Sequence, residues 1–598
     1  MKIPSLTEIT TKAESAFKRF PITLVWSILG SLYCMSIVGD SSLDLFEDKS
    51  NVLLTLSLGI SWLIGIQFFV EQFKNKKKWL WLKVVVLALL GLFYWYYPSV
   101  YHYTQNPIYL TRFFLYLIAG HLFVLFAPFL VKWDKNAYWN YLNLTGVAIT
   151  RSLFFSGILF LGLVLALIAI EALFDINIKR RRYGQLFIFC LGIVNTWIYL
   201  ADFPKNVMQN TTIQLNKAIE VLVKYILIPL VILYLLILYA YSAKIVIEWE
   251  LPKGWVSYLV IALSVLGYVI QIIINPIQKS IKSWTINRFF PWFYLLLIPL
   301  NILLFVAIFR RINDYGITEN RYFVLAIAIW NVAMIAYILL SKKKALRTIP
   351  ISLFAIAIFS SFGFWGAHSV SNASQTRQFE EIFNKVKENN NTASQSELYQ
   401  LKSILTFLEE RKKVTNLNSV TQLNIEDFRE EGYEYNTFGY LNKYKIWKKL
   451  DIKLDSASLT NNASSNRIYY NKSNYSNVKL STSIADYDYF TYLNYYNTNK
   501  TIDAGVYDIL LDMNTIEIDI YTKKDSLKHI RIPIKQKLLE LSEKTDNLNN
   551  LDDSNFNFTT ENKTMKINLF LSEVSFNIKT DKKITFTSFK AFLFIKEK

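Results

Sequence analysis

The sequence predicts an α-helical polytopic membrane bundle of about eleven transmembrane helices, followed by a C-terminal extramembrane α+β domain that is β-rich at its end. Three observations predict this class. Hydrophobic residues make up 53% of the 598 residues, and charged residues only 19%. Apolar stretches long enough to cross a bilayer recur before residue 370. After Ala367 the composition shifts to Asn, Ser, Thr, Lys and Tyr, and an alternating apolar pattern follows.

The apolar stretches have about 18–24 residues each, which suits a membrane-spanning helix. They are Ile22–Gly39, Val52–Val70, Trp79–Tyr97, Ile108–Val131, Ser152–Phe174, Tyr183–Phe203, Val221–Ala243, Trp255–Asn275, Pro291–Phe309, Tyr322–Leu340 and Ile349–Ala367. The segment Ala137–Arg151 is too polar for a span and fits an interfacial helix. We therefore expect a transmembrane domain over 1–370, a helical linker or subdomain over 371–445 and a β-rich extramembrane domain over 446–598.

The net charge of +19 is concentrated beside the apolar stretches. Residues 371–598 hold 32 basic and 30 acidic residues, so residues 1–370 carry a surplus of 17 positive charges. Alternate loops divide these charges unequally, 19 against 10, when the N-terminus is placed inside. The positive-inside rule then predicts a cytoplasmic N-terminus, and the odd number of spans puts the C-terminal domain outside the cytoplasm. This placement argues against nucleic acid as a partner.

The sequence lacks the motifs of several kinds of metal site and catalytic site. Cys34 and Cys190 both lie in apolar stretches, and His529 is the lone histidine of the C-terminal region, so no metal site is expected. The chain has no G-x-S-x-G, no Gly-rich phosphate loop and no H-E-x-x-H. We therefore assign no catalytic residue and no cofactor.

Three ionisable residues within the spans are candidates for an intramembrane polar site, because charge in hydrocarbon is costly. They are His121, Glu171 and Asp202. Facing one cavity, they would suit a transporter of a small molecule or ion. In the simpler interpretation each residue has a local structural role. His121 then bonds to a neighbouring helix, Glu171 pairs with the nearby basic run, and Asp202 faces lipid headgroups.

Two basic clusters on the outer side violate the positive-inside rule, so topology alone does not explain them. They are Lys179, Arg180, Arg181 and Arg182, and then Arg310, Arg311 and Arg321. We expect them to hold anionic headgroups or another anionic ligand. If both lined one cleft with a carboxylate, they would suit an enzyme acting on lipid-linked substrates. Asp314 and Glu319 lie close in sequence and would neutralise part of the second cluster.

Two polar loops between spans carry a resemblance. One reads WELPKGWVSY and ends at Tyr258, and the other, Arg310–Val324, reads RRINDYGITENRYFV. The sequence IPISLFAIAIFSSFGFWGAHSVS follows the next span, and LKSILTFLEE begins at Leu401. Their order and spacing, over Tyr183–Arg411, resemble a bacterial multi-pass membrane family, domain of unknown function 4153. The resemblance implies a bacterial inner membrane and carries no catalytic assignment.

The C-terminal region changes its period along the chain. Ser394 and Glu397 form a potential capping box, and Leu401, Ile404, Leu405 and Leu408 make one apolar stripe of a helix. Further on, Ile530, Ile532 and Ile534 alternate with polar residues, as do the residues after Met565, which predicts antiparallel strands with one buried face. The stretch Tyr487–Tyr507 is either an aromatic surface for a glycan or peptide or simply the packing of a small sheet.

These features favour a non-enzymatic envelope interaction or sensing protein. The expected partners are the lipid bilayer and a periplasmic protein or glycan. The transporter and the membrane enzyme remain as alternatives, and the sequence does not determine the oligomeric state.

Overall fold

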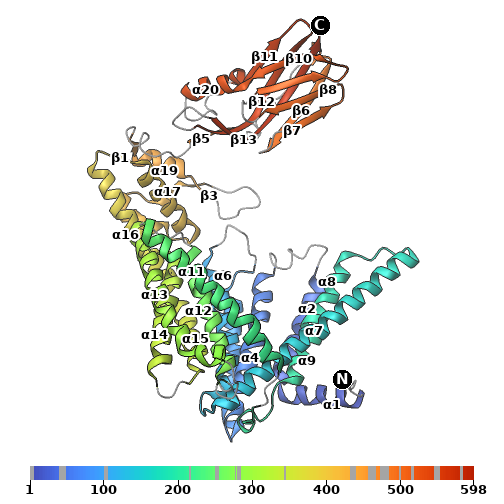
Figure 1. Ribbon diagram of the computed structural model, residues 1–598, viewed down its shortest axis with the longest axis vertical. Coiled ribbons are helices and arrows are strands. Elements are labelled where there is room, and N and C mark those ends of the chain that lie inside the picture. The colour runs from blue at the N-terminus through green and yellow to red at the C-terminus, as the bar shows by residue number, and fades with distance from the viewer. Residues whose placement is uncertain are drawn as a thin grey trace. The chain divides into compact units, whose positions relative to one another are not determined.

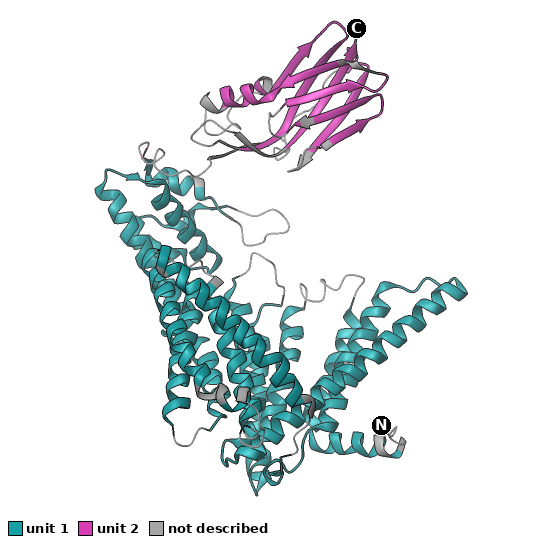
Figure 2. Cartoon of the chain, in the orientation of Figure 1, with its two compact units in different colours: residues 1–454 teal, residues 455–598 magenta. Residues whose placement is uncertain are grey.

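The computed structural model describes all of the 598 residues except 1–5, 39–48, 100–105, 214–216, 249–254, 276–277, 279–283, 342–344, 431–439, 456–465, 472–483, 497–499, 513–516, 545–552 and 579–583. The chain forms two compact units, residues 1–454 and 455–598 (Figure 2). The loop motif WELPKGWVSY falls mostly outside the described residues, because 249–254 are among those omitted.

The first unit is mostly a helical bundle (Figure 1). Within the part of the chain that the structure describes, nine helices are long and apolar enough to cross a membrane. They are α4 (Ser50–Glu71), α5 (Trp81–Tyr96), α6 (Ile108–Phe126), α7 (Lys135–Phe174), α8 (Arg180–Ile188) continued by α9 (Asn195–Asp202), α10 (Lys217–Val221) continued by α11 (Ile228–Glu248), α12 (Trp255–Ile274), α13 (Trp284–Tyr315) and α14 (Glu319–Leu340). The predicted fold class, a polytopic membrane bundle with a β-containing C-terminal region, is confirmed.

The first and last predicted spans differ from the rest. α1 (Leu6–Arg19) and α2 (Pro21–Ile37) meet at a bend of 103° and count as a tenth span only if taken together. Pro21 stands at the first turn of α2, where its missing N–H costs no hydrogen bond. α15 (Thr348–Ser360) is apolar but has only 13 residues. Every predicted apolar stretch is thus largely helical, but fewer than eleven helices have spanning length in the described chain.

The segment Ala137–Arg151 is not a separate interfacial helix. It forms the first part of α7, a continuous helix of 40 residues. The Asp134 side chain caps its start by accepting a hydrogen bond from the Ala137 N–H at 2.8 Å. Polar residues are tolerated here because they are buried against protein: Asn140, for example, donates to the backbone oxygen of Asn210 at 2.7 Å.

Small residues and buried polar contacts hold the bundle together. A side chain on Gly59 would collide with the Trp26 ring, and one on Gly267 with the Phe293 ring, so these glycines permit close helix packing. Asn331 on α14 donates to Ser264 on α12 at 2.8 Å and to Asn301 on α13 at 2.9 Å. Three spans are therefore joined at one buried amide.

The connections gather at two ends of the bundle. At one end, which we call the Arg19 end, Arg19 donates to Phe203 O, and Gln72 donates to Ala127 O. At the other, the Glu319 end, Arg112 donates to Ser361 O at 3.0 Å. Asn106 donates there to Arg411 O at 3.2 Å.

A helical subdomain completes the first unit. It comprises α16 (Ala367–Glu388), α17 (Gln395–Glu410), α18 (Asn418–Thr421) and α19 (Lys443–Leu450), with the short strands β1 (Thr392–Ala393), β2 (Arg429–Glu430), β3 (Tyr440–Leu441) and β4 (Lys453–Leu454). The predicted capping box is confirmed, since Ser394 and Glu397 bond each other's backbone N–H. Leu401, Ile404, Leu405 and Leu408 are buried in its core, as their spacing predicts.

The second unit is built of two antiparallel sheets and one helix (Figure 1). One sheet has the order β10-β9-β8-β7, and the other β11-β12-β13-β6, with β5 also paired to β12. The strands are β5 (Asn466–Asn471), β6 (Tyr489–Tyr496), β7 (Lys500–Ala504), β8 (Tyr507–Asp512), β9 (Glu517–Thr522), β10 (Asp525–Pro533), β11 (Asn557–Glu561), β12 (Met565–Ile578) and β13 (Ile584–Glu597). Ile534 does not continue the alternating strand, because it opens α20 (Ile534–Lys544) after Pro533.

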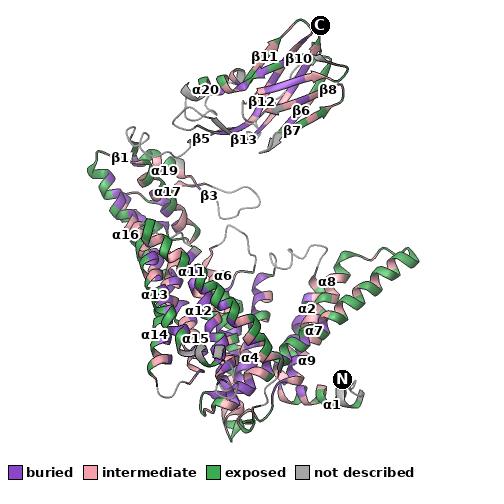
Figure 3. Cartoon of the chain, in the orientation of Figure 1, coloured by how far each residue is buried: buried purple, intermediate pink, exposed green. Residues whose placement is uncertain are grey.

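Burial follows the strand alternation in this unit. Ile518, Ile520, Ile530 and Ile532 all contribute to a core shared with the strands of the other sheet and with α20 (Figure 3). Each sheet therefore buries its apolar face, as the period of two predicts, although Asp519 on the other face of β9 is also buried, where it pairs with Arg531.

Candidate functional site

A deeply buried ionic site lies at the Glu319 end. Arg411, directly after α17, donates to both carboxylate oxygens of Glu319, at 2.7 and 3.0 Å. His368 Nδ1 lies 3.2 Å from the same carboxylate. The Glu319 and Arg411 side chains are only 11% and 10% exposed. This group, which we call the junction, joins the bundle to the helical subdomain.

Local sequence explains how Glu319 is presented. Gly316 has a φ of +68°, which favours glycine, and it turns the chain between α13 and α14. Thr318 occupies the N-cap position of α14, although its side chain makes no capping hydrogen bond. Glu319 follows in the first turn of α14, where the helix dipole favours a carboxylate.

Two side chains of α16 form hydrogen bonds with the backbone of this turn. Gln375 Nε2 donates to the backbone oxygens of Tyr315 and Ile317, at 2.9 and 3.2 Å. Ser374 Oγ accepts from the Ile317 N–H at 2.8 Å. A Cβ on Gly316 would lie 2.8 Å from the Gln375 amide nitrogen, so the turn has no room for a side chain.

Polar atoms without partners surround the junction. His368 Nε2, Ser371 Oγ and Asn372 Oδ1 are buried and make no hydrogen bond among the described residues. Ser371 and Asn372 follow His368 by three and four positions on α16, so all three lie on one face of the helix. The junction therefore combines a fixed ion pair with spare hydrogen-bonding capacity.

The three predicted intramembrane residues are not brought together. Asp202 pairs with Arg151 at 2.9 Å and with Lys12 at 3.4 Å. Glu171 accepts from the Tyr183 hydroxyl at 3.2 Å, and it lies 20 residues beyond Arg151 on α7, or about 30 Å along the helix axis. His121 is on α6, where its Nδ1 contacts Leu117 O at 2.8 Å. Each has a local partner, but not the predicted one: His121 contacts its own helix, Glu171 contacts a tyrosine rather than the basic run, and Asp202 pairs with basic side chains rather than with headgroups.

The two predicted basic clusters differ in how far they are neutralised. Lys179, Arg180, Arg181 and Arg182 are exposed at the start of α8, with Arg182 bonded to Gln185 at 2.9 Å. Arg310 pairs with Asp314 at 3.0 Å. Arg321 donates to the backbone oxygens of Tyr315 and Gly316. Glu319 pairs with Arg411 rather than with this cluster.

A row of aromatic rings covers one face of the five-stranded sheet. Phe592 on β13 stacks with Phe490 at 6.0 Å between ring centroids and lies 5.3 Å from Tyr492, both on β6. Phe570 and Phe594 extend the row. Phe490 is 55% exposed and Tyr492 is 45% exposed, while the alternate residue Leu493 is buried in the core. These five residues form what we call the aromatic face, in which Phe490 and Tyr492 are the exposed rings and Phe594 is buried.

Ion pairs border the aromatic face. Lys590 contacts Glu573 at 2.7 Å, and Lys596 contacts Asp488 at 2.9 Å. The hydrogen bond from Lys596, followed by one from the Glu597 backbone, holds the pKa of Asp488 below its ordinary value. The aromatic face is thus an apolar surface with a charged rim, an arrangement common at binding surfaces.

Glu319, His368 and Arg411 were not predicted as site residues. The signal available was their position: each lies in or directly after one of the segments that carry the family resemblance. The segments RRINDYGITENRYFV, GAHSVS and LKSILTFLEE meet at the junction.

Comparison with known proteins agrees with that resemblance. A family model described as a domain of unknown function (DUF4153) matches residues 52–384. A protein of Pasteurella multocida (strain Pm70), named "Uncharacterized protein PM1469", is 27% identical over 384 residues. That match covers 63% of this chain and 61% of the relative, so it spans about three-fifths of the relative's length. No solved structure matches the chain.

Proposed function

This chain belongs to the DUF4153 family, and we propose that it is an inner-membrane protein that senses or binds an envelope partner through its C-terminal region. The nine helices of the described residues that are long and apolar enough to cross a membrane support a membrane protein. The observation that carries the proposal is the aromatic face, because exposed aromatic rings with a polar rim suit binding of a protein or a glycan.

The junction supports a sensing role. A buried, bidentate ion pair fixes the helical subdomain to the α13–α14 turn. Because Glu319 is the first residue of a span, a force on the subdomain would act directly on that helix. The helical subdomain is followed in the chain by the second unit, which carries the aromatic face.

The orientation of the chain belongs to the same proposal. The unequal distribution of basic loop residues favours a cytoplasmic N-terminus, which puts the Glu319 end and the C-terminal region in the periplasm. The outer-side basic clusters then face periplasmic headgroups. The alternative of an enzyme acting on lipid-linked substrates would require both clusters to line one cleft.

The test is photo-crosslinking of the full-length protein in living cells of a bacterium that carries it. A photoreactive amino acid replaces Tyr492 on the aromatic face or, as a control, the exposed Gln536 on α20. We expect a discrete crosslinked product, protein or glycan, from position 492 and none from 536. Equal crosslinking at both positions, or none at 492 in any growth condition, would contradict the proposal.

A further inference from the structure

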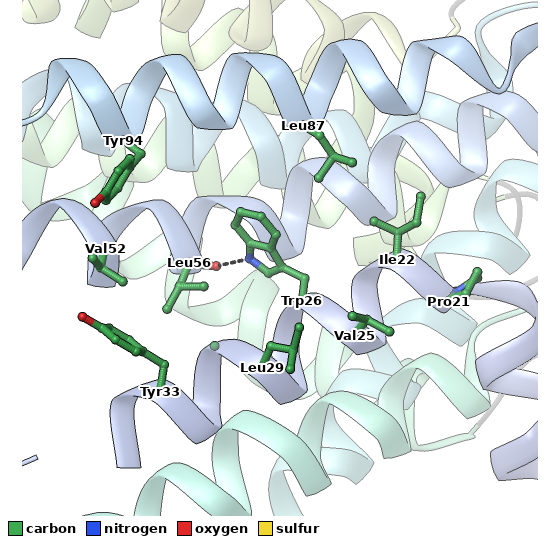
Figure 4. Close-up of a pocket in the computed structure, with 11 residues that line it drawn as sticks. Pro21, Ile22, Val25, Trp26, Leu29, Tyr33, Val52, Leu56, Leu87 and Tyr94 are labelled. Atoms are coloured by element: carbon green, nitrogen blue, oxygen red, sulfur yellow. Dashed lines mark hydrogen bonds between the residues drawn. The ribbon is translucent and has the colours of Figure 1, made fainter. Parts of the chain in front are cut away.

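An apolar groove runs along α2 at the side of the bundle (Figure 4). It has a volume of about 770 Å³ and is walled by α2, α4 and α5. Pro21, Val25, Leu29 and Tyr33 line it from α2, with Leu56 from α4 and Leu87 from α5. The volume lies within the range of about 300–1,000 Å³ that is usual for ligand sites.

The groove is elongated along α2. Its α2 lining residues recur every four positions, so they form one stripe along the helix. From Pro21 to Tyr33 this stripe extends about 18 Å, more than half of a hydrocarbon core about 30 Å thick. The Trp26 indole N–H is already bonded to Leu56 O at 3.0 Å, so it offers no free donor to the groove. Such a surface matches an extended hydrocarbon chain.

One mouth of the groove lies at the Arg19 end. The 103° bend before Pro21 sets α1 nearly perpendicular to α2, which places α1 along the membrane surface when α2 crosses it. Arg19 donates to both oxygens of Glu71, at 2.9 and 2.8 Å, and thereby fixes the bend beside the end of α4. The groove mouth is therefore at the depth of lipid headgroups.

A run of lysines lies in the connection between α4 and α5, the helices that wall the groove, at the Arg19 end. Lys76, Lys77 and Lys78 follow α4 and are exposed to solvent. Lys83 on α5 precedes the lining residue Leu87 by one helical turn, and its ammonium group donates to Gln67. The far end of the groove carries Tyr33 and Tyr94 instead. In the described chain the far end also carries Lys49, which precedes α4, so the three consecutive lysines leave an excess of positive charge at the Arg19 end. Such an excess complements a ligand with an anionic head and an apolar tail.

From this juxtaposition we propose that the groove binds one anionic phospholipid of the bilayer. One acyl chain lies along α2 between α4 and α5, and the headgroup phosphate contacts Lys76–Lys78. This site is separate from the aromatic face and the junction, and it does not depend on the proposed function.

The experiment uses the full-length protein in phosphatidylcholine nanodiscs that contain a trace of phosphatidylglycerol with a photoreactive acyl chain. After irradiation, we expect labelled peptides from α2 and α5. Excess unlabelled phosphatidylglycerol should compete for the label, and excess phosphatidylcholine should not. The variant Leu29→Trp should reduce labelling of α2 several-fold, because Leu29 is 61% exposed and its replacement fills the groove. Replacing Lys76, Lys77 and Lys78 by Gln should weaken binding roughly fivefold for each lysine removed.

Matched variants control for general effects. Leu165→Trp adds the same bulk to a residue of α7 that is 65% exposed. Replacement of Arg180, Arg181 and Arg182 by Gln removes the same charge at the start of α8. Neither should change the labelling of α2. Equal competition by both lipids would mean annular lipid only, and crosslinks between two protein copies at α2 would mean a self-association surface. Either result overturns the proposal.

Discussion

Glu319 is a carboxylate buried at the end of a span, and Arg411 neutralises it. Removing one member of a buried ion pair leaves an uncompensated charge, which costs about 3–5 kcal/mol. We therefore predict that Glu319→Gln loosens the helical subdomain and accelerates amide hydrogen exchange in the first turns of α16. The control is Glu410→Gln, which removes another carboxylate near Arg411, at 3.3 Å, whose side chain is 58% exposed. Exposed pairs contribute only about 0–1 kcal/mol. Equal exchange in both variants would refute the role of the junction.

Glu397 gives the helical subdomain a defined response to acid. Burial alone would raise its pKa, but hydrogen bonds from Lys385 and from Ser394 outweigh burial and leave the pKa below the ordinary value of 4.5. The stabilisation is therefore complete above pH 4.5 and is lost as the pH falls through the lower pKa of the folded state. We predict that α17 loses exchange protection below pH 4.5. Glu397→Gln should show lower protection at pH 7 and a weaker dependence on acid. If the variant kept the wild-type pH profile, another group would be responsible.

The sequence could not predict which residues pair with each other over long distances in the site. Glu319 was expected to neutralise Arg310 and Arg311, which are close in sequence, but it pairs with Arg411, 92 positions away. Short-range pairs such as Ser394 with Glu397, or Arg310 with Asp314, follow from helical spacing and were predictable. The Glu319–Arg411 contact requires the packing of α16 and α17 on the bundle, which no local pattern encodes.

The spans themselves are elements whose existence hydrophobicity predicted well. The error over Ala137–Arg151 has a physical reason: polarity excludes a helix from lipid but not from a protein interior, where Asn140 and Thr145 are buried. The aromatic stretch of the C-terminal region was left between two interpretations. Both interpretations hold for part of the stretch, because successive side chains of a strand point to opposite faces of the sheet. Leu493 and Tyr507 pack in the core, while Phe490 and Tyr492 face outward.

The buried amide of Asn331 links three elements, α12, α13 and α14. Besides its bonds to Ser264 and Asn301, it accepts a hydrogen bond from the Tyr268 hydroxyl. Hydrogen bonds between membrane helices contribute about 0.6 kcal/mol on average, so the three together justify a loss of about 2 kcal/mol for Asn331→Leu. Reversible unfolding of the full chain in mixed micelles measures this loss. Ile335→Leu, at another buried position of α14, is the control and should change little. Equal stability of the two variants would show that the network contributes nothing.

At the scale of the whole molecule, the two bundle ends carry different kinds of contact. The Arg19 end joins the termini of spans to one another, whereas the Glu319 end joins the bundle to the helical subdomain. The sequence predicted alternating spans and an unequal division of basic residues between loops, because both are properties of whole segments, but it did not predict which contacts form at each end. What the ends bind depends on side chains that come together only after folding.

The central claim is a multi-pass inner-membrane protein whose C-terminal region faces the envelope. Cysteine labelling in intact cells tests it most directly, because the native Cys34 and Cys190 are buried and should give little background. Tyr399→Cys lies in the helical subdomain and Lys205→Cys at the Arg19 end, both at exposed positions. With a membrane-impermeant maleimide that crosses the outer membrane, we predict labelling of Cys at position 399 in intact cells, and at position 205 only after the inner membrane is permeabilised. Labelling of 205 but not 399 in intact cells would contradict the orientation and the envelope role together.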